Sequence, residues 1–119
     1  MNRHQLSVAL ILMSGLHAGT ALAHAKLMQS YPAAHAVVDA PAAVSVSFNE
    51  ALEPAFSQLT VLDSQGVRVA TEKAGVDEAT HKTLSVPVPK LAPGSYTVKW
   101  AVVSVDGHRI KGQYTFGVK

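Results

Sequence analysis

Apolar and polar residues alternate with a period of two in several parts of this sequence, and this alternation limits its possible folds more than any other feature. Valine and phenylalanine alternate with serine and asparagine over residues 44–49, and the same period runs through residues 84–88 and 96–102. A period of two puts the apolar side chains of a segment on one face of a β-strand, whereas an amphipathic helix needs a period of about 3.6. The chain is therefore expected to be an all-β protein whose strands are buried on one face.

Four further segments have the composition of strands, and turn residues separate them. They are residues 26–29, 59–62, 67–71 and 113–118. About seven short strands at this spacing predict an antiparallel β-sandwich. Because proline cannot donate a hydrogen bond to a sheet, Pro87 predicts an edge position for its strand. Residues 50–56 are expected to form one irregular helical turn, and residues 72–81 a polar loop.

Residues 1–23 have the three parts of a secretory signal peptide. A short basic start is followed by an apolar stretch over residues 6–16 and by the small-residue sequence at 21–23. The apolar stretch is about eleven residues long, too short for the roughly twenty that span a bilayer. Cleavage during export is therefore predicted, which leaves residues 24–119 as one domain.

The exported segment contains no cysteine and has almost no net charge. Without disulfides, core burial alone must hold the domain together, and soft thiolate metal sites are excluded. Of the ten lysines and arginines in the whole chain, only Arg3 precedes residue 24, so nine remain against eight Asp and Glu. These cations are spread along the sequence, which does not favour binding to nucleic acid.

Cleavage before His24 would give this histidine a free α-amine. The amine and the imidazole Nδ1 of one N-terminal histidine can close a chelate ring on a metal ion, which an internal histidine cannot do. Asp106 and His108 lie two residues apart, so both side chains are expected on one face of an extended segment, and Gly107 permits a tight turn between them. Three nitrogens and one carboxylate oxygen suit a tetragonal Cu(II) ion better than tetrahedral zinc or the all-oxygen shells of calcium and magnesium.

These polar residues also have ordinary structural interpretations. An Asp-Gly pair such as Asp106-Gly107 is common in hairpin turns, so this segment alone does not define a metal site. His35 and His81 fall in expected loops, where a solvated imidazole is the default. Glu50 follows an expected strand and could either orient a ligand imidazole or face solvent. The aromatic residues of the strands lie on apolar faces and are expected to pack in the core.

Several segments of the exported chain resemble the CopC family of periplasmic copper-resistance proteins. They are residues 24–27, the strand end at 46–50, residues 94–100, the Ser-x-Asp-x-His motif at 104–108, and residues 112–116. The resemblance extends over residues 24–119 and implies a Greek-key β-sandwich or barrel of the immunoglobulin-like, cupredoxin-like type. It also implies one Cu(II) ion per chain, held by the amine and imidazole of His24, by Asp106 and by His108.

The same resemblance implies a protein of copper homeostasis and resistance rather than an enzyme. Such a protein would reside in the periplasm, a monomer by default, and sequester Cu(II) or deliver it to a CopD-like transporter of the inner membrane. Met28 is the one methionine in residues 24–119. Because a Cu(I) site built from thioethers needs several sulfurs, only Cu(II) is expected to bind.

A second hypothesis is a copper oxidase with a histidine brace. The polysaccharide monooxygenases also use an N-terminal histidine and a second imidazole, as His24 and His108 would provide. Asp106 argues against this hypothesis, because its carboxylate would occupy a coordination position that oxygen chemistry needs open, and its charge would favour Cu(II) over Cu(I). A purely structural, adhesive sandwich is a third hypothesis, which explains the strands but leaves these three residues as coincidence.

The donor set predicts that copper affinity depends on pH. The α-amine and both imidazoles must lose their protons before they bind a metal ion, so Cu(II) affinity is expected to fall as the pH drops from about 8 toward about 5. Competition titrations at the two pH values measure this change. Equal affinities at both values would show that the donor set is wrong.

Overall fold

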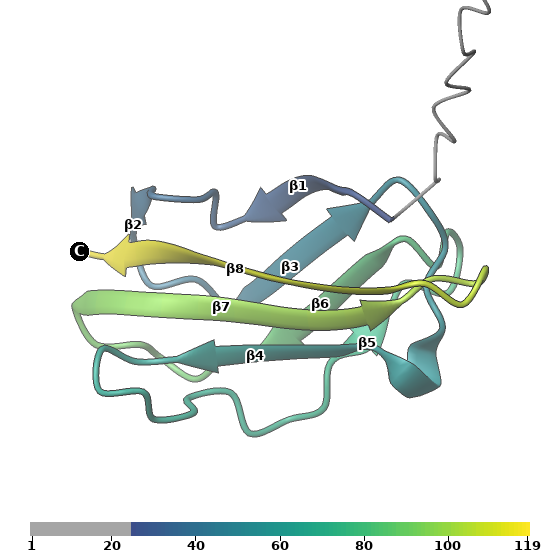
Figure 1. Cartoon of the computed structure of the whole chain (residues 1–119). Coiled ribbons are helices and arrows are strands. Elements are labelled where there is room, and N and C mark those ends of the chain that lie inside the picture. The colour runs from purple at the N-terminus through teal and green to yellow at the C-terminus, as the bar shows by residue number, and fades with distance from the viewer. Residues whose placement is uncertain (1–24) are drawn as a thin grey trace, which may run out of the picture.

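The computed structural model describes residues 25–119, which form two β-sheets packed face to face (Figure 1). The first sheet has the order β1 (Leu27–Tyr31), β3 (Ala43–Phe48), β6 (Thr83–Pro87) and β5 (Gly75–Val76). The second sheet has the order β2 (Val37–Val38), β8 (Arg109–Val118), β7 (Gly94–Val103) and β4 (Gln58–Leu62). A turn of 3-10 helix, η1 (Pro54–Phe56), precedes β4. The predicted signal peptide and His24 lie outside the described residues.

The predicted all-β sandwich is confirmed, with eight strands in the described part of the chain rather than about seven. The chain crosses between the sheets after β1, β2, β3, β4 and β6, as expected of a Greek-key, immunoglobulin-like sandwich. The helical turn expected within residues 50–56 is present as η1. Within residues 25–119, no helix is long and apolar enough to cross a membrane.

The prediction of a strand at residues 67–71 is wrong. After β4, the chain reverses in a turn in which the Asp63 carboxylate accepts hydrogen bonds from the N–H groups of Gln65 and Val67, both at 2.9 Å. After this turn, Arg68 forms an isolated β-bridge with Leu62. Beyond the turn, the N–H of Val69 donates to the carbonyl of Val61 at 2.9 Å, but the pairing with β4 amounts to a single bridge, which is too short to count as a strand. Conversely, the two-residue strands β2 and β5 were not expected, because two residues are too few to show an alternation.

Two expectations about strand pairing also need correction. β2 runs parallel to β8, with Val37 opposite Gly117, so the sandwich is not wholly antiparallel. The strand that contains Pro87 is not an edge strand, because β6 lies between β3 and β5. Pro87 pairs with Ala43 of β3, but β5 extends only as far as Ser85. The proline therefore lies beyond the end of β5, where its missing N–H deprives no neighbour of a hydrogen bond.

Aromatic side chains fill the middle of the sandwich. The Trp100 ring meets Phe48 edge-on, with centroids 6.3 Å apart, and lies tilted against Tyr114 at 6.0 Å. Tyr96 stacks on Phe116 at 5.6 Å. All five side chains are buried, and the prediction that Phe48, Tyr96, Trp100 and Phe116 pack in the core is confirmed.

Substituting Gly112 by alanine is expected to destabilise the domain. Gly112 lies opposite Trp100 in the β7–β8 pair, and a Cβ added there would lie 2.3 Å from Cζ2 of the indole. Because Phe48 and Tyr114 confine the indole, we expect a loss of about 1–3 kcal/mol in the free energy of unfolding, measured by urea denaturation. Gly75→Ala is the matched control, since a Cβ there meets nothing within 4 Å. Similar losses in both variants would contradict this account.

Candidate metal centre

The loop between β7 and β8 carries two of the predicted ligands, Asp106 and His108. The two strands pair along their whole length and leave residues 104–108 as the loop. The N–H of Ser104 donates to the carbonyl of His108 at 3.0 Å and closes this loop. Gly107 has a φ of +89°, in the left-handed region that favours glycine. A tight hairpin loop therefore holds both side chains at one end of the sandwich.

Asp106 and His108 contact each other directly. The carboxylate oxygen Oδ2 of Asp106 lies 2.8 Å from the imidazole Nδ1 of His108. The other oxygen, Oδ1, accepts hydrogen bonds from the hydroxyl of Ser104 and from the N–H of His108, the latter at 3.2 Å. The side chains of Asp106 and His108 are 38% and 42% exposed. The loop thus presents an oxygen and a nitrogen donor side by side, both open to an ion from solvent.

These hydrogen bonds lower the pKa of Asp106 from its usual 3.8 to about 2. The hydroxyl of Ser104 makes the largest contribution and His108 the next, because both donate to the charged form of the carboxyl group. Ser104 is itself fully buried, which holds its hydroxyl in the loop. Asp106 is therefore ionised over the whole neutral pH range and supplies a fixed negative charge.

A short segment between β3 and η1 connects this loop to the first described residues of the chain. The side-chain oxygen of Asn49 accepts a hydrogen bond from the N–H of Lys26 at 2.6 Å, and the N–H of Asn49 donates to the carbonyl of Lys26 at 3.1 Å. The carbonyl of Ala51 accepts a hydrogen bond from the N–H of Val105 at 3.0 Å. Figure 1 shows the start of β1 and the β7–β8 loop at the same end of the sandwich. Lys26 therefore lies at the end that carries Asp106.

The other polar candidates take different positions. The N–H of His35 donates to the carbonyl of Thr115 at 2.7 Å, well along β8 from the loop. The carbonyl of His81 accepts a hydrogen bond from the N–H of Leu52 at 2.7 Å, so the backbone of His81 is near the loop end. Glu50 belongs to the connecting segment just described. The imidazole of His108 is in contact with Asp106, which can orient it in the way considered above for Glu50.

Within residues 25–119, no three His, Cys, Asp or Glu side chains gather closely enough to hold a metal ion. Asp106 and His108 form a pair of donors, and the third predicted ligand, His24, lies outside the described residues. Sequence reasoning does not assign a role to Ser104 or Asn49, which position the loop and the chain start. The feature of the sequence that could have indicated a role for Ser104 is its place in the Ser-x-Asp-x-His motif. For Asn49, that feature is its position as a polar residue directly after a strand.

The fold and this loop define a small β-sandwich that presents a carboxylate and an imidazole at one end. The chain belongs to the CopC family, since the model of the CopC domain matches residues 27–119. The chain is 44% identical over 111 residues to protein YobA of Escherichia coli K12, a match that covers 92% of this chain and 90% of YobA. The crystal structure of CopC from Methylosinus trichosporium OB3b is similar, with a TM-score of 0.76 and 39% identity, covering 81% of this chain and 94% of CopC.

A longer relative carries copper in its name. The copper transport protein CutJ of Bacillus subtilis is 32% identical over 120 residues, a match that covers 99% of this chain but 22% of CutJ. The resemblance seen in the sequence is thereby confirmed, and the chain is a member of a copper resistance and transport family.

Removing the Ser104 hydroxyl is expected to raise the pKa of Asp106 from about 2 toward 3.8. A lowered pKa in the folded state stabilises the protein above about pH 4, and this contribution is lost as the pH falls toward about 2. The free energy of unfolding of the Ser104→Ala variant should therefore fall less between about pH 4 and about pH 2 than that of the unchanged protein. Carbon-13 NMR of the carboxyl groups, recorded against pH on copper-free protein, measures the midpoint.

Asp77 is the internal control for this titration, because the hydroxyl and N–H of Thr80 lower its pKa independently of the loop. The midpoint of Asp77 should be the same in both proteins. An unchanged midpoint for Asp106 would contradict the role given to Ser104.

Proposed function

We propose that this protein is an exported carrier that binds one Cu(II) ion per chain through His24, Asp106 and His108. The observation that carries the proposal is the direct contact between Asp106 and His108, in a loop held by the buried Ser104. An anionic oxygen and an imidazole nitrogen, adjacent and partly exposed, are donors that suit divalent copper.

The spacing of this pair is compatible with one tetragonal ion. Two ligands on neighbouring corners, each about 2.0 Å from a metal ion, are about 2.8 Å apart. The same separation, 2.8 Å, joins Oδ2 of Asp106 to Nδ1 of His108. An ion bound to both atoms would lie to one side of the line that joins them, so the imidazole and the carboxylate would have to turn toward it, whereas their separation need not change. The loop therefore holds the two donors at a suitable separation.

The start of the chain supports the third ligand. Lys26 is hydrogen-bonded to Asn49, and Ala51 is hydrogen-bonded to Val105. Because two residues of backbone span at most about 7 Å, these two contacts lie close together. His24 precedes Lys26 by two residues, so at most about 7 Å of backbone separates the two, and we propose that His24 completes the site. Cleavage of residues 1–23 would supply the free amine that completes a set of three nitrogens and one oxygen.

Carriage of copper, rather than catalysis, is the proposed activity. The ionised carboxylate of Asp106 stabilises Cu(II) against the reduction with which an oxidase begins its reaction. Met28 is the one methionine from residue 24 onward, so the several sulfurs of a Cu(I) site are not provided. CutJ, which is named as a copper transport protein, supports the same role.

Delivery to a membrane transporter of the CopD type is the proposed fate of the copper. In CutJ, the part that matches this chain makes up 22% of a longer copper transport protein. A carrier domain joined to the rest of a transport protein is the arrangement expected if the two exchange copper. We place the carrier in the periplasm, since the predicted signal peptide directs its export, and we take the monomer as the default state.

Copper titration followed by electron paramagnetic resonance tests the ligand set. Protein that begins at His24 is expected to bind one Cu(II) ion, and one extra residue before His24 should remove or reshape the signal, because the amine no longer adjoins the imidazole. His108→Asn should weaken the affinity by about a hundredfold. His35→Asn is the matched control, because His35 lies away from the loop and asparagine tolerates its φ of +64°.

Two outcomes would contradict this assignment. Identical spectra and affinities for the native and extended N-termini would exclude the amine of His24 as a ligand. Equal losses of affinity in His108→Asn and His35→Asn would mean that the β7–β8 loop is not the site.

A further inference from the structure

Among residues 25–119, the strands contain three charged residues, and all three are cations. The residues of β1 to β6 are uncharged. Lys99 lies in β7, and Arg109 and Lys111 lie in β8. All three side chains are exposed, whereas the residues that follow Lys99 and Arg109, namely Trp100 and Ile110, pack on the core. Cations that are far apart in the sequence are thus collected on the outer face of one sheet.

Strand register brings these cations close to one another. Lys111 lies opposite Ala101 in β7, and Lys99 lies opposite the next outward residue of β8, Gln113. Lys99 and Lys111 are therefore diagonal neighbours on one face, at a Cα spacing of about 7–8 Å. Arg109 occupies the following outward position of β8, beside the loop that holds the proposed copper ligands.

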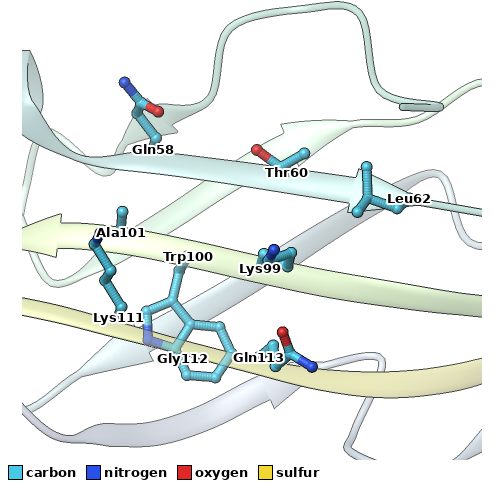
Figure 2. A pocket seen from close by; sticks show the side chains of 9 residues that line it. All are labelled: Gln58, Thr60, Leu62, Lys99, Trp100, Ala101, Lys111, Gly112 and Gln113. Carbon is cyan, nitrogen blue, oxygen red and sulfur yellow. The ribbon is translucent and has the colours of Figure 1, made fainter. Parts of the chain in front are cut away.

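A shallow hollow of about 460 Å³ lies on this face. Figure 2 shows that Gln58 and Thr60 from β4, Lys99 from β7, and Lys111 and Gln113 from β8 surround it. Ala101 lies between Gln58 and Lys111 in the sheet, and its small side chain leaves the depression open. Ammonium, amide and hydroxyl groups around the hollow are all hydrogen-bond donors suited to carboxylate groups.

Lys99, Arg109 and Lys111 form no ion pair with a carboxylate of the described residues. Within residues 25–119, the one ion pair closer than 4.0 Å is that of His108 with Asp106. The outward positions of β4, β7 and β8 carry no Asp or Glu. The net charge of the segment from residue 24 is only about +1, so the positive character of this face is local and comes from the strand register.

We infer that the outer face of β4, β7 and β8 is a docking surface for an acidic segment of the protein that exchanges copper with this one. The identity of the partner as a protein that exchanges copper rests on the proposed function. The charge and the shape of the face do not depend on it. Carboxylate side chains of an extended segment fit between Lys99 and Lys111 in the hollow. A segment seated there runs past Arg109 to the loop of Asp106 and His108, where the metal would be transferred.

An acidic protein segment fits this face better than an anionic membrane does. The cations border a hollow that also carries amide and hydroxyl donors, whereas a lipid surface is flat. Bound Cu(II) adds positive charge beside Arg109, so the acidic segment binds the loaded carrier more tightly than the empty one.

Nuclear magnetic resonance of nitrogen-15-labelled, copper-free protein tests the surface with a glutamate homopeptide as the probe and a glutamine homopeptide of equal length as its control. The amides of Lys99, Ala101, Lys111 and Gln113 should shift with the glutamate peptide alone, and salt should reverse the shifts. The Lys99→Gln/Lys111→Gln double variant should bind the peptide about fivefold to tenfold more weakly.

The Lys82→Gln/Lys90→Gln double variant is the matched control, because it removes the same charge from exposed residues outside these strands, and neither lysine lines the hollow. It should bind the glutamate peptide within about twofold of the unchanged protein. Equal weakening in both double variants would show that net charge alone attracts the peptide, and would overturn the inference. Binding to phosphatidylglycerol vesicles with no shifts from the glutamate peptide would also overturn it, in favour of a membrane surface.

A second arm separates this inference from the copper site. The Lys99→Gln/Lys111→Gln variant should keep the Cu(II) affinity of the unchanged protein, since neither lysine belongs to the proposed ligand set. Loading with Cu(II) should tighten peptide binding to the unchanged protein, and no tightening in protein shown to bind copper would overturn the link to copper exchange. Loss of copper binding by itself would count against the ligand set and not against the docking face, which the copper-free experiment measures.

Discussion

The register of the β7–β8 hairpin is the constraint on which the rest of this structure depends. Ten residue pairs join the two strands, and because side chains alternate between faces, one register assigns every one of these residues to the core or to solvent. It places Trp100 against Gly112, where any larger residue would collide with the indole. A shift of β8 by one residue against β7 would turn Lys111 toward the core and would expose Tyr114 and Phe116. The same register leaves residues 104–108 at the tip, as the loop that holds the candidate metal ligands.

The candidate site combines a rigid support with an accessible surface. Ser104 is fully buried and binds the carboxylate of Asp106, yet Asp106 and His108 remain about two-fifths exposed. In the proposed copper site, this buried anchoring would reduce the cost of ordering the donors on binding. Exposure would let a second protein reach a bound ion. A carrier needs both properties, because it must hold copper and also release it.

Much of the fold could be predicted from the sequence, because burial of one strand face leaves a pattern of period two. That pattern located β3, β6 and β7 and the aromatic core. The two-residue strands could not be found in this way, and neither could the parallel pairing of β2 with β8, since pairing partners lie far apart in the chain. The prediction of a strand at 67–71 was wrong because the chain after the turn at Asp63 pairs with β4 at a single bridge, and the sequence does not show how far a pairing extends.

For the candidate site, the sequence by itself determined which chemical groups are present: an Asp and a His two residues apart, a glycine that permits the turn, a histidine at the predicted cleavage point, and no thiol. Only the tertiary structure decided that Asp106 contacts His108 and that Asn49 brings Lys26 to the same end of the sandwich. It likewise decided that cations dispersed in the sequence share one face. The physical reason is that residue identity is local, whereas proximity depends on strand pairing between distant segments, which the folded core as a whole selects.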